Sequence, residues 1–196
     1  MSLNISLYTV SAVLILDNEG RRLYAKYYQP SLTDAGTSST PAEFENQSQQ
    51  HKFETNLFSK INKVHQDIIL YDNHLITYKQ TNDIILIFVA KINENESLIF
   101  STMTNLFESL NILLDNVIDK QTIIEKYDMV SLAIDETIDD GIIIEYDPAT
   151  IVSRVTNPPT AQYDVNLKNI DISEKGIFNA LSFASKKIGE RLQQGL

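Results

Sequence analysis

The sequence predicts an α+β fold, in which helices flank a five-stranded antiparallel sheet. Two observations carry this prediction. Short apolar runs separated by turn residues occur in two groups along the chain, and apolar residues at helical spacing follow each group. The expected order is therefore two strands, a helix, three strands and then several helices.

The first two strands are predicted at Tyr8–Leu16 and Leu23–Tyr28, which flank a turn containing Gly20. The overlapping run Leu7–Leu16 is as apolar as the core of a signal peptide. It has no Lys or Arg before it and no small-residue cleavage site after it. We therefore expect this run to be a strand of the folded domain.

A polar stretch and a helix are expected next. Residues 29–50 are rich in Ser, Thr, Gln, Asn and Pro and lack periodicity, which is typical of a flexible surface insertion. Apolar residues then recur at spacings of four, four and three at Phe53, Leu57, Ile61 and Val64. This spacing predicts a helix of about three turns with one apolar face.

Three further strands complete the predicted sheet. The runs Ile68–Tyr71 and His74–Lys79 flank the turn residues Asp72 and Asn73, which is the pattern of a second hairpin. The segment Ile84–Ala90 is almost continuously apolar. We expect it to be a central strand.

Two apolar stripes predict the helices that follow the sheet. The first runs from Ile99 to Leu113 and is preceded by Asn93, which we expect to cap the helix. The second runs from Ile123 to Ile138. It predicts one helix or a broken pair of helices, ending at Gly141, because glycine tolerates the left-handed conformation beyond a helix end.

The chain is expected to divide near residue 157. Asp147 followed by Pro148 predicts the cap and first residue of a helix that runs to about Val155. We assign residues 1–157 to the folded domain and residues 158–196 to a linker and a C-terminal amphipathic helix. The apolar stripe of that helix consists of Ile177, Leu181, Ala184, Ile188 and Leu192.

Composition argues against several classes of function. The 26 Asp and Glu residues outnumber the 16 Lys and Arg residues, so the formal net charge is −10, which disfavours binding to nucleic acid. The chain has no cysteine and needs no oxidising compartment, so we expect a cytoplasmic location. No apolar run approaches the roughly 18 residues of a membrane-spanning helix, and membrane contact is expected to be indirect.

No sequence pattern indicates catalysis or cofactor binding. The six glycines are dispersed, and His51, His65 and His74 accompany no nucleophile or metal-binding motif. Acidic residues cluster around Gly141, but alignment with a calcium loop places Ile138 at a ligand position. We predict no catalytic residue, no cofactor and no metal site. The acidic run is interpreted as a solvated helix face or as a contact surface for a basic partner.

The candidate partner-binding residues are Tyr24, Lys26, Tyr27 and Tyr28. The three rings lie on both faces of one predicted strand, so at least one face needs cover from a helix of the same chain or from a partner. Tyrosine is frequent at interfaces because its ring buries a large area while its hydroxyl remains hydrogen-bonded. Both alternatives remain open from the sequence.

Three segments resemble the coatomer zeta family and, more distantly, the sigma small chains of clathrin adaptors. They are residues 12–20, 23–28 and 132–145, and the similarity extends to the ending 190–196. The resemblance implies a longin-like fold and a non-enzymatic structural subunit of the COPI coat. It also implies pairing with the coatomer gamma subunit, and recruitment of the coat to Golgi membranes by Arf-family GTPases.

Within the same resemblance, Asn116 and Val117 match part of the pocket in which sigma chains hold acidic dileucine signals. Thr122 departs from the pattern, because an apolar residue is expected there. An alternative to the coat subunit is a soluble longin-type trafficking regulator that binds a small GTPase or a SNARE.

Overall fold

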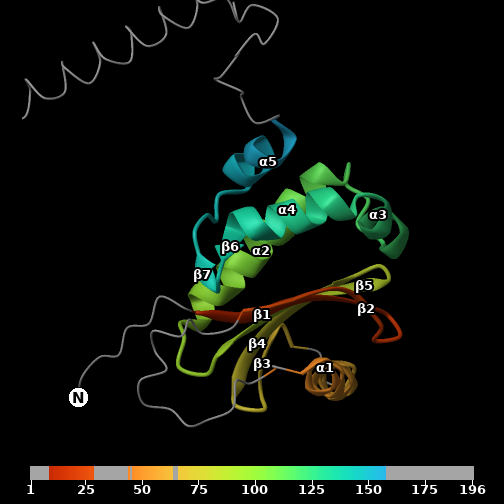
Figure 1. Cartoon of the computed structure of the whole chain (residues 1–196), viewed down its shortest axis with the longest axis vertical. Helices are drawn as coiled ribbons and strands as arrows, with labels where there is room; N and C mark the ends of the chain where they lie inside the picture. Colours follow the sequence, from red (N-terminus) through yellow and green to blue (C-terminus); the bar gives the residue numbers. More distant parts are fainter. Residues whose placement is uncertain (1–8, 29–43, 45, 64–65, 158–196) are drawn as a thin grey trace, which may run out of the picture. The chain divides into compact units, whose positions relative to one another are not determined.

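A computed structural model describes residues 9–28, 44, 46–63 and 66–157. Five strands form an antiparallel sheet in the order β2-β1-β5-β4-β3 (Figure 1). They are β1 (Val10–Asp17), β2 (Arg22–Tyr27), β3 (Ile68–Tyr71), β4 (His74–Thr81) and β5 (Ile84–Lys91). The predicted sheet is confirmed, with β5 at its centre. The predicted C-terminal helix lies outside the described residues.

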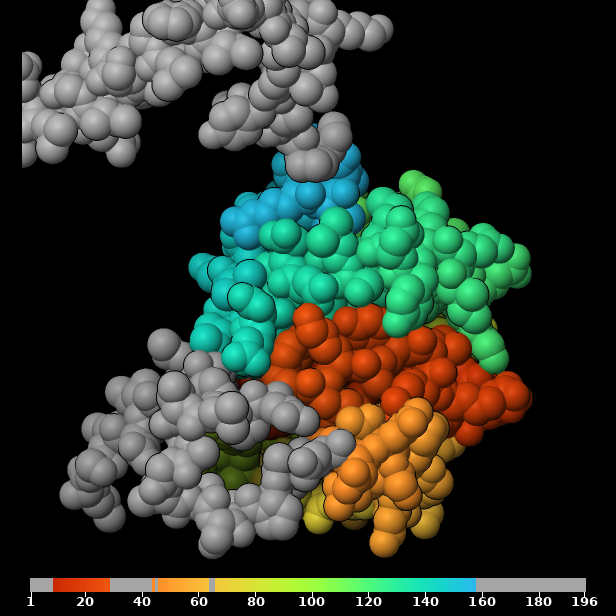
Figure 2. Space-filling model, viewed as in Figure 1, coloured from red at the N-terminus to blue at the C-terminus, as the bar shows by residue number. Residues whose placement is uncertain are grey.

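Helices cover both faces of the sheet (Figure 1). The helix α1 lies on one face, and α2 and α4 lie on the other, with α5 packed on α2 and α4. Figure 2 shows the same succession of layers from α5 through the helices and strands to α1. The bounds are α1 (Gln47–Ile61), α2 (Glu96–Leu113), α3 (Lys120–Glu125), α4 (Tyr127–Thr137) and α5 (Pro148–Thr156), with a small hairpin of β6 (Ile138–Asp139) and β7 (Ile142–Ile143).

The central strand β5 is buried on both faces, which explains its continuous apolar sequence. Its alternate residues enter two separate clusters. Ile84, Leu86, Phe88 and Ala90 pack with residues of α2 and α4, whereas Ile85, Ile87 and Val89 pack with residues of α1. The sheet therefore needs a helical layer on each side.

The helix α1 buries the predicted apolar residues Phe53, Leu57 and Ile61, and Val64 lies outside the described residues. The predicted flexible insertion at 29–50 is wrong for its last residues, because α1 already begins at Gln47. The first three residues of α1 are polar and exposed, so they show no apolar period that would reveal a helix. Most of the preceding residues lie outside the described part of the chain.

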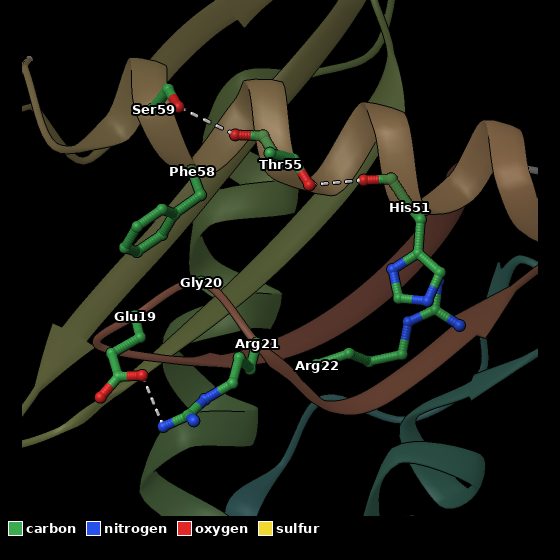
Figure 3. A pocket seen from close by; sticks show the side chains of 8 residues that line it. All are labelled: Glu19, Gly20, Arg21, Arg22, His51, Thr55, Phe58 and Ser59. Carbon is green, nitrogen blue, oxygen red and sulfur yellow. Dashed lines mark hydrogen bonds and ion pairs between the residues drawn. The ribbon is translucent and has the colours of Figure 1, made fainter.

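Phe58 of α1 packs over the turn between β1 and β2 (Figure 3). Gly20 in this turn has a φ of +80°, and a Cβ added there would lie 2.6 Å from Cδ1 of Phe58. The backbone conformation and the close approach of the ring both favour glycine at this position.

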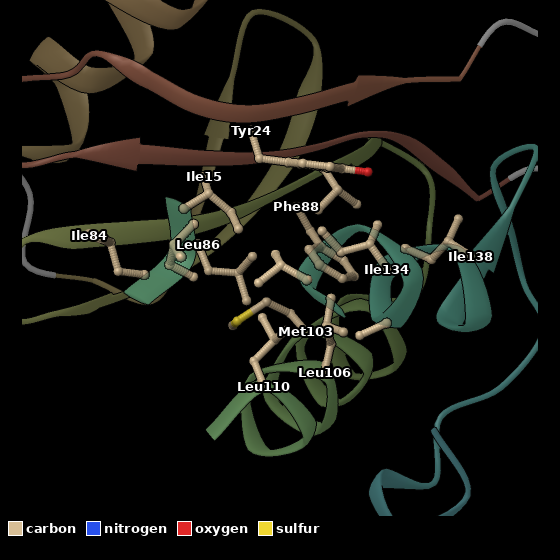
Figure 4. Packing of buried hydrophobic residues seen from close by; sticks show 14 of the residues in the cluster. Ile15, Tyr24, Ile84, Leu86, Phe88, Met103, Leu106, Leu110, Ile134 and Ile138 are labelled. Atoms are coloured by element: carbon tan, nitrogen blue, oxygen red, sulfur yellow. The ribbon is translucent and has the colours of Figure 1, made fainter. Parts of the chain in front are cut away.

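The larger part of the core lies between the sheet and the helices α2 and α4 (Figure 4). Met103, Leu106 and Leu110 project from α2 toward Leu86 and Phe88 of the sheet. The residues of the predicted α2 stripe are all buried, at Ile99, Met103, Leu106, Leu110 and Leu113. The helical spacing in the sequence therefore identified the buried face correctly.

The predicted cap of α2 is wrong by two residues. Asn95, and not Asn93, caps the helix, and its Oδ1 accepts hydrogen bonds from the backbone N–H groups of Ser97 and Leu98 at 3.0 and 3.2 Å. Asn93 lies in the turn that leads the chain out of β5. The path from strand to helix decides which asparagine can cap.

The stripe from Ile123 to Ile138 forms a broken pair of helices, α3 and α4, as one of the two alternatives predicted. Gly141 does not end a helix, because α4 ends at Thr137 and Ile138 is a buried strand residue. Gly141 instead lies in the turn of the β6–β7 hairpin, with a φ of +81°. Its carbonyl oxygen accepts hydrogen bonds from the backbone N–H groups of Thr9 and Val10, both at 3.0 Å.

A buried carboxylate joins the β1–β2 turn to α3. The side chain of Asp17 accepts hydrogen bonds from the backbone N–H and Nε of Arg21, at 2.8 and 2.9 Å, and from Nζ of Lys120 at 2.8 Å. Burial alone would raise the pKa of Asp17, but these hydrogen bonds outweigh it and hold the pKa well below its usual range. The ionised form of Asp17 therefore stabilises the fold.

Gly20 and Gly141, which both have a positive φ, should differ in their tolerance of substitution by alanine. We expect Gly20→Ala to lower the free energy of unfolding by about 1 kcal/mol, because the Phe58 ring can move aside. Gly141→Ala should cost at least about 2 kcal/mol, because its Cβ would lie 2.7 Å from the carbonyl oxygen of Val10. Urea unfolding of both variants tests the ranking, and an equal or reversed order would contradict it.

Replacing Asp17 should show a specific pH dependence. Because the folded-state pKa is depressed, its stabilising effect is present above the unfolded-state pKa of about 3.9 and is lost as pH falls toward the folded-state value. We expect Asp17→Asn to lower the free energy of unfolding by about 2–4 kcal/mol at neutral pH. The difference from wild type should shrink by about 1 kcal/mol between pH of about 5 and about 3.

The exposed Asp67 provides the matched control for this measurement. Asp67→Asn should change the free energy of unfolding by less than about 0.5 kcal/mol. A difference between Asp17→Asn and wild type that is independent of pH would contradict the stabilising role of the ionised carboxylate.

Candidate partner-binding surface

The predicted partner-binding residues lie on or directly after β2, which is an edge strand of the sheet. Side chains alternate between the two faces of a strand. Tyr24, Lys26 and Tyr28 therefore face the layer of α4, whereas Tyr27 faces α1. This placement agrees with the expectation of tyrosine rings on both faces.

Tyr24 is packed within the chain. It is 5% exposed, and its ring centroid lies 5.8 Å from that of Tyr127 on α4. Burial raises the pKa of Tyr24 to about 12, although a hydrogen bond with Ser131 acts in the opposite direction. Tyr24 therefore serves as a neutral core residue between β2 and α4.

Lys26 and Tyr28 form a partly exposed link between β2 and the end of α4. Nζ of Lys26 lies 2.6 Å from Oδ1 of Asp135 and 5.4 Å from the ring centroid of Tyr28. The Tyr28 hydroxyl donates to the carbonyl oxygen of Ile138 at 3.5 Å, and burial raises the pKa of Tyr28. Both side chains stay partly exposed, so a partner could also contact them.

Tyr27 belongs to a polar network beneath α1. Its hydroxyl donates to Oε1 of Glu54 at 2.7 Å, and Arg22 donates to both oxygens of the same carboxylate, at 2.6 and 3.0 Å. Glu54 is 2% exposed. Burial, together with the hydrogen bond to Glu54, raises the pKa of Tyr27.

Sequence reasoning did not identify Glu54 as part of this network. Glu54 lies among polar residues of a helix, and its partners Arg22 and Tyr27 lie about 30 residues earlier in the chain. The only indication in the sequence was that Glu54 directly follows Phe53, a residue of the predicted apolar face of the helix. For Tyr24 and Tyr27, the contacts favour cover by the chain itself over cover by a partner.

Asn116 and Val117 follow the end of α2. Asn116 has a φ of +63°, and its Oδ1 accepts a hydrogen bond from Nδ2 of Asn111 at 2.9 Å. Val117 is 48% exposed. Thr122 lies in α3, and its backbone N–H donates to Oδ1 of the capping Asp119 at 2.8 Å. The Asn116 amide thus has an internal partner, and Val117 is the surface residue of this pair.

The acidic run around Gly141 consists of Asp135, Glu136, Asp139, Asp140 and Glu145, and three of these carboxylates form ion pairs. Arg154 of α5 contacts Glu136 at 3.3 Å and Glu145 at 3.2 Å, and Asp135 pairs with Lys26. Among the residues that the structure describes, no three potential metal ligands converge. Glu136 thus links α4 to α5, and Asp135 links α4 to β2.

Exposed apolar side chains are concentrated on the helical layer formed by α2 to α5. On this layer and its connections, the exposed large apolar residues are Leu98, Ile112, Val117, Ile124, Tyr127, Leu132, Ile144 and Tyr146. Leu132 and Asp135 lie three residues apart on α4 and therefore on neighbouring positions of its surface. On β2 and α4, the side chains of Lys26 and Tyr28 are partly exposed and those of Tyr127 and Leu132 are exposed.

Comparison with known proteins identifies the family. The family model for the clathrin adaptor complex small chain matches residues 9–162. The chain belongs to this family.

Its similarity to coatomer zeta subunits is extensive. It is 44% identical over 194 residues to coatomer subunit zeta of Saccharomyces cerevisiae, covering 98% of this chain and 99% of that one. It is 31% identical over 183 residues to coatomer subunit zeta-1 of Homo sapiens, covering 93% and 92%. The resemblance drawn from the sequence is confirmed.

The structural comparison concerns the fold alone. A chain in a homology model of the full-length AP-3 complex matches with a TM-score of 0.55 and 17% identity, covering 74% of this chain and 90% of that chain. This match supports the longin-like architecture. Among the described residues, no helix has the length and apolar character needed to cross a bilayer.

Serine substitutions should separate packing from partner contact on β2. Because Tyr24 is buried, we expect Tyr24→Ser to lower the melting temperature and the affinity for the partner in parallel. Tyr28→Ser should weaken pairing more than it lowers the melting temperature, because this ring remains partly exposed. Thermal unfolding and a pairing assay on the same samples test this, and equal losses for Tyr28→Ser would favour a purely structural role.

Proposed function

We propose that this chain is a zeta-type structural subunit of the COPI vesicle coat, without catalytic activity. The observation that carries the proposal is its 44% identity to coatomer subunit zeta of Saccharomyces cerevisiae over nearly the full length of both chains. In this role the chain supports assembly of the coat in Golgi-to-ER and intra-Golgi transport. It acts in the cytoplasm and on the cytosolic face of Golgi membranes and COPI vesicles.

The proposed direct partner is the coatomer gamma subunit, with which the chain forms a heterodimer. Contacts with the other coatomer subunits, with an Arf-family GTPase and with the membrane are indirect. Support comes from the exposed apolar residues beside the β2 edge, since a stable interface combines apolar area with a polar rim. We propose Lys26 and Tyr28, together with Tyr127 and Leu132, as contact residues.

Strongly perturbed titratable groups in the described chain have structural roles, which agrees with a non-enzymatic subunit. Asp17, whose pKa is lowered, anchors the β1–β2 turn to Lys120. Tyr24 and Tyr27 are buried against neighbouring helices. The pKa shifts of these groups arise from burial and from hydrogen bonds within the fold, which are common causes of such shifts outside active sites.

Co-expression with the trunk of the coatomer gamma subunit tests the proposal. Size-exclusion chromatography with light scattering should give a stable one-to-one complex, and the chain alone should be less soluble because its partner surface is exposed. A well-behaved monomer that ignores the trunk would contradict the coat role. The alternative of a regulator that binds a small GTPase or a SNARE would then be the next hypothesis.

Charge substitutions on exposed leucines locate the contact in the same experiment. Leu132→Asp on α4 should weaken the complex at least about tenfold, because it places a charge in the apolar part of the interface. Leu70→Asp on β3, at the opposite edge of the sheet, is the matched control and should leave pairing unchanged. Equal effects of the two variants would contradict the proposed surface.

A further inference from the structure

The outer side of β3 presents backbone groups that have no hydrogen-bond partner among the described residues. The backbone N–H of Tyr78 on β4 donates to the carbonyl oxygen of Asp67, directly before β3, at 3.0 Å. In an antiparallel pair, residues alternately direct both backbone groups toward the partner strand or away from it. Ile68 and Leu70 therefore direct their N–H and C=O groups away from β4, at the edge of the sheet opposite to β2 (Figure 1).

The side chains of the same two residues form an apolar strip along this edge. Because side chains alternate along a strand, Ile68 and Leu70 lie on one face of the sheet. Ile68 is partly buried against the core cluster of α2 and α4, whereas Leu70 is 59% exposed. A strand added to β3 would place alternate side chains beside Ile68 and Leu70 and cover them.

A carboxylate flanks each end of β3. Asp67 precedes the strand and Asp72 follows it, and both are exposed. Neither forms an ion pair with another described residue. Lys79 lies on the neighbouring strand β4, but it is half-buried, and its Nζ lies 4.3 Å from the ring centroid of Phe107 on α2. The two carboxylates are thus free to pair with cations of a ligand.

We propose that an extended segment of a partner protein adds to the free edge of β3, with apolar side chains at alternate positions and Lys or Arg near its ends. Backbone hydrogen bonds to Ile68 and Leu70 supply affinity, and the apolar strip supplies specificity. Charge complementarity with Asp67 and Asp72 selects the basic ends. A second copy of this chain is less favoured, because it would bring like charges together and has a net charge of −10.

This function goes beyond the proposed coat role. It uses the edge of the sheet opposite to β2, where the contact with the gamma subunit is proposed. Both partners could therefore bind the same chain.

Fluorescence anisotropy with the full chain tests the proposal. The probe is a labelled peptide Lys-Thr-Val-Thr-Val-Thr-Lys, blocked at both ends, whose Val residues would pair with Ile68 and Leu70. N-methylation of both Val residues should weaken binding at least about tenfold, because it removes the donors that face β3. N-methylation of the two inner-facing neighbours on the other edge, the first and second Thr, should weaken it less than about threefold. All three peptides have the same charge, so non-specific attraction to an acidic chain cannot produce this difference.

Substitutions at Leu70 separate its backbone donor from its side chain. Proline is tolerated on an edge strand where the N–H faces solvent, so Leu70→Pro should fold with a melting temperature close to that of Leu70→Thr. Both variants lose the leucine side chain, but only Leu70→Pro loses the N–H group. We expect Leu70→Pro to bind the peptide at least about fivefold more weakly than Leu70→Thr.

A matched pair of charge substitutions tests the role of the flanking carboxylates. Asp72 and Asp140 are both exposed turn residues with a positive φ, and neither forms an ion pair with a described residue. Asparagine tolerates this conformation. We expect Asp72→Asn to weaken peptide binding at least about threefold and Asp140→Asn to leave it unchanged.

Four results would overturn the proposal. They are no saturable binding of the unmodified peptide up to about 1 mM, equal binding of the two N-methylated peptides, equal binding by the two Leu70 variants, and equal effects of Asp72→Asn and Asp140→Asn. Self-association of the chain that Leu70→Pro abolishes would also contradict it and assign the edge to a second copy. Leu132→Asp, which should weaken pairing with the gamma subunit, should bind the peptide normally, so failure here and failure of the coat role are distinguishable.

Discussion

Burial of residues 84–90 of β5 on both faces of the sheet is the constraint on which the rest of the structure depends. A strand with apolar side chains on each face is stable only if a layer of side chains excludes water from both sides. The helix α1 supplies one layer, and α2 with α4 supplies the other. Two buried carboxylates then connect the parts of the fold, Asp17 with Lys120 at α3 and Glu54 with Arg22 at α1.

These internal demands leave the outer surface for function. The helical layer is acidic and exposes apolar residues beside the β2 edge, which suits a large partner chain of a coat. On the opposite face of the sheet, Arg21 and Arg22 form ion pairs with carboxylates of the same chain. Membership of the adaptor small-chain family and close similarity to coatomer zeta subunits agree with a subunit that works by contact.

Local patterns predicted most elements because burial repeats at fixed spacings. The apolar run of β5 and the apolar stripe of α2 are examples, because in each case the residues of a single segment were enough to predict which side chains are buried. The roles of Asn95 and Gly141 could not be assigned in this way. The path of the chain out of β5 decides that Asn95 caps α2. Gly141 lies in a hairpin turn and is held by its hydrogen bond with Val10. For the candidate site, the sequence identified the rings of β2 but not their cover. That cover depends on residues distant in the chain.

Hydrogen–deuterium exchange tests the central claim that the domain folds on its own core and uses its β2–α4 surface for a partner. Exchange should be compared between the free chain and the chain mixed with its proposed partner, the coatomer gamma subunit. The amides of β5 should exchange slowest in both states, and pairing should add protection along β2 and α4. Rapid exchange of β5 in the free chain, or unchanged exchange of β2 and α4 on pairing, would contradict this account.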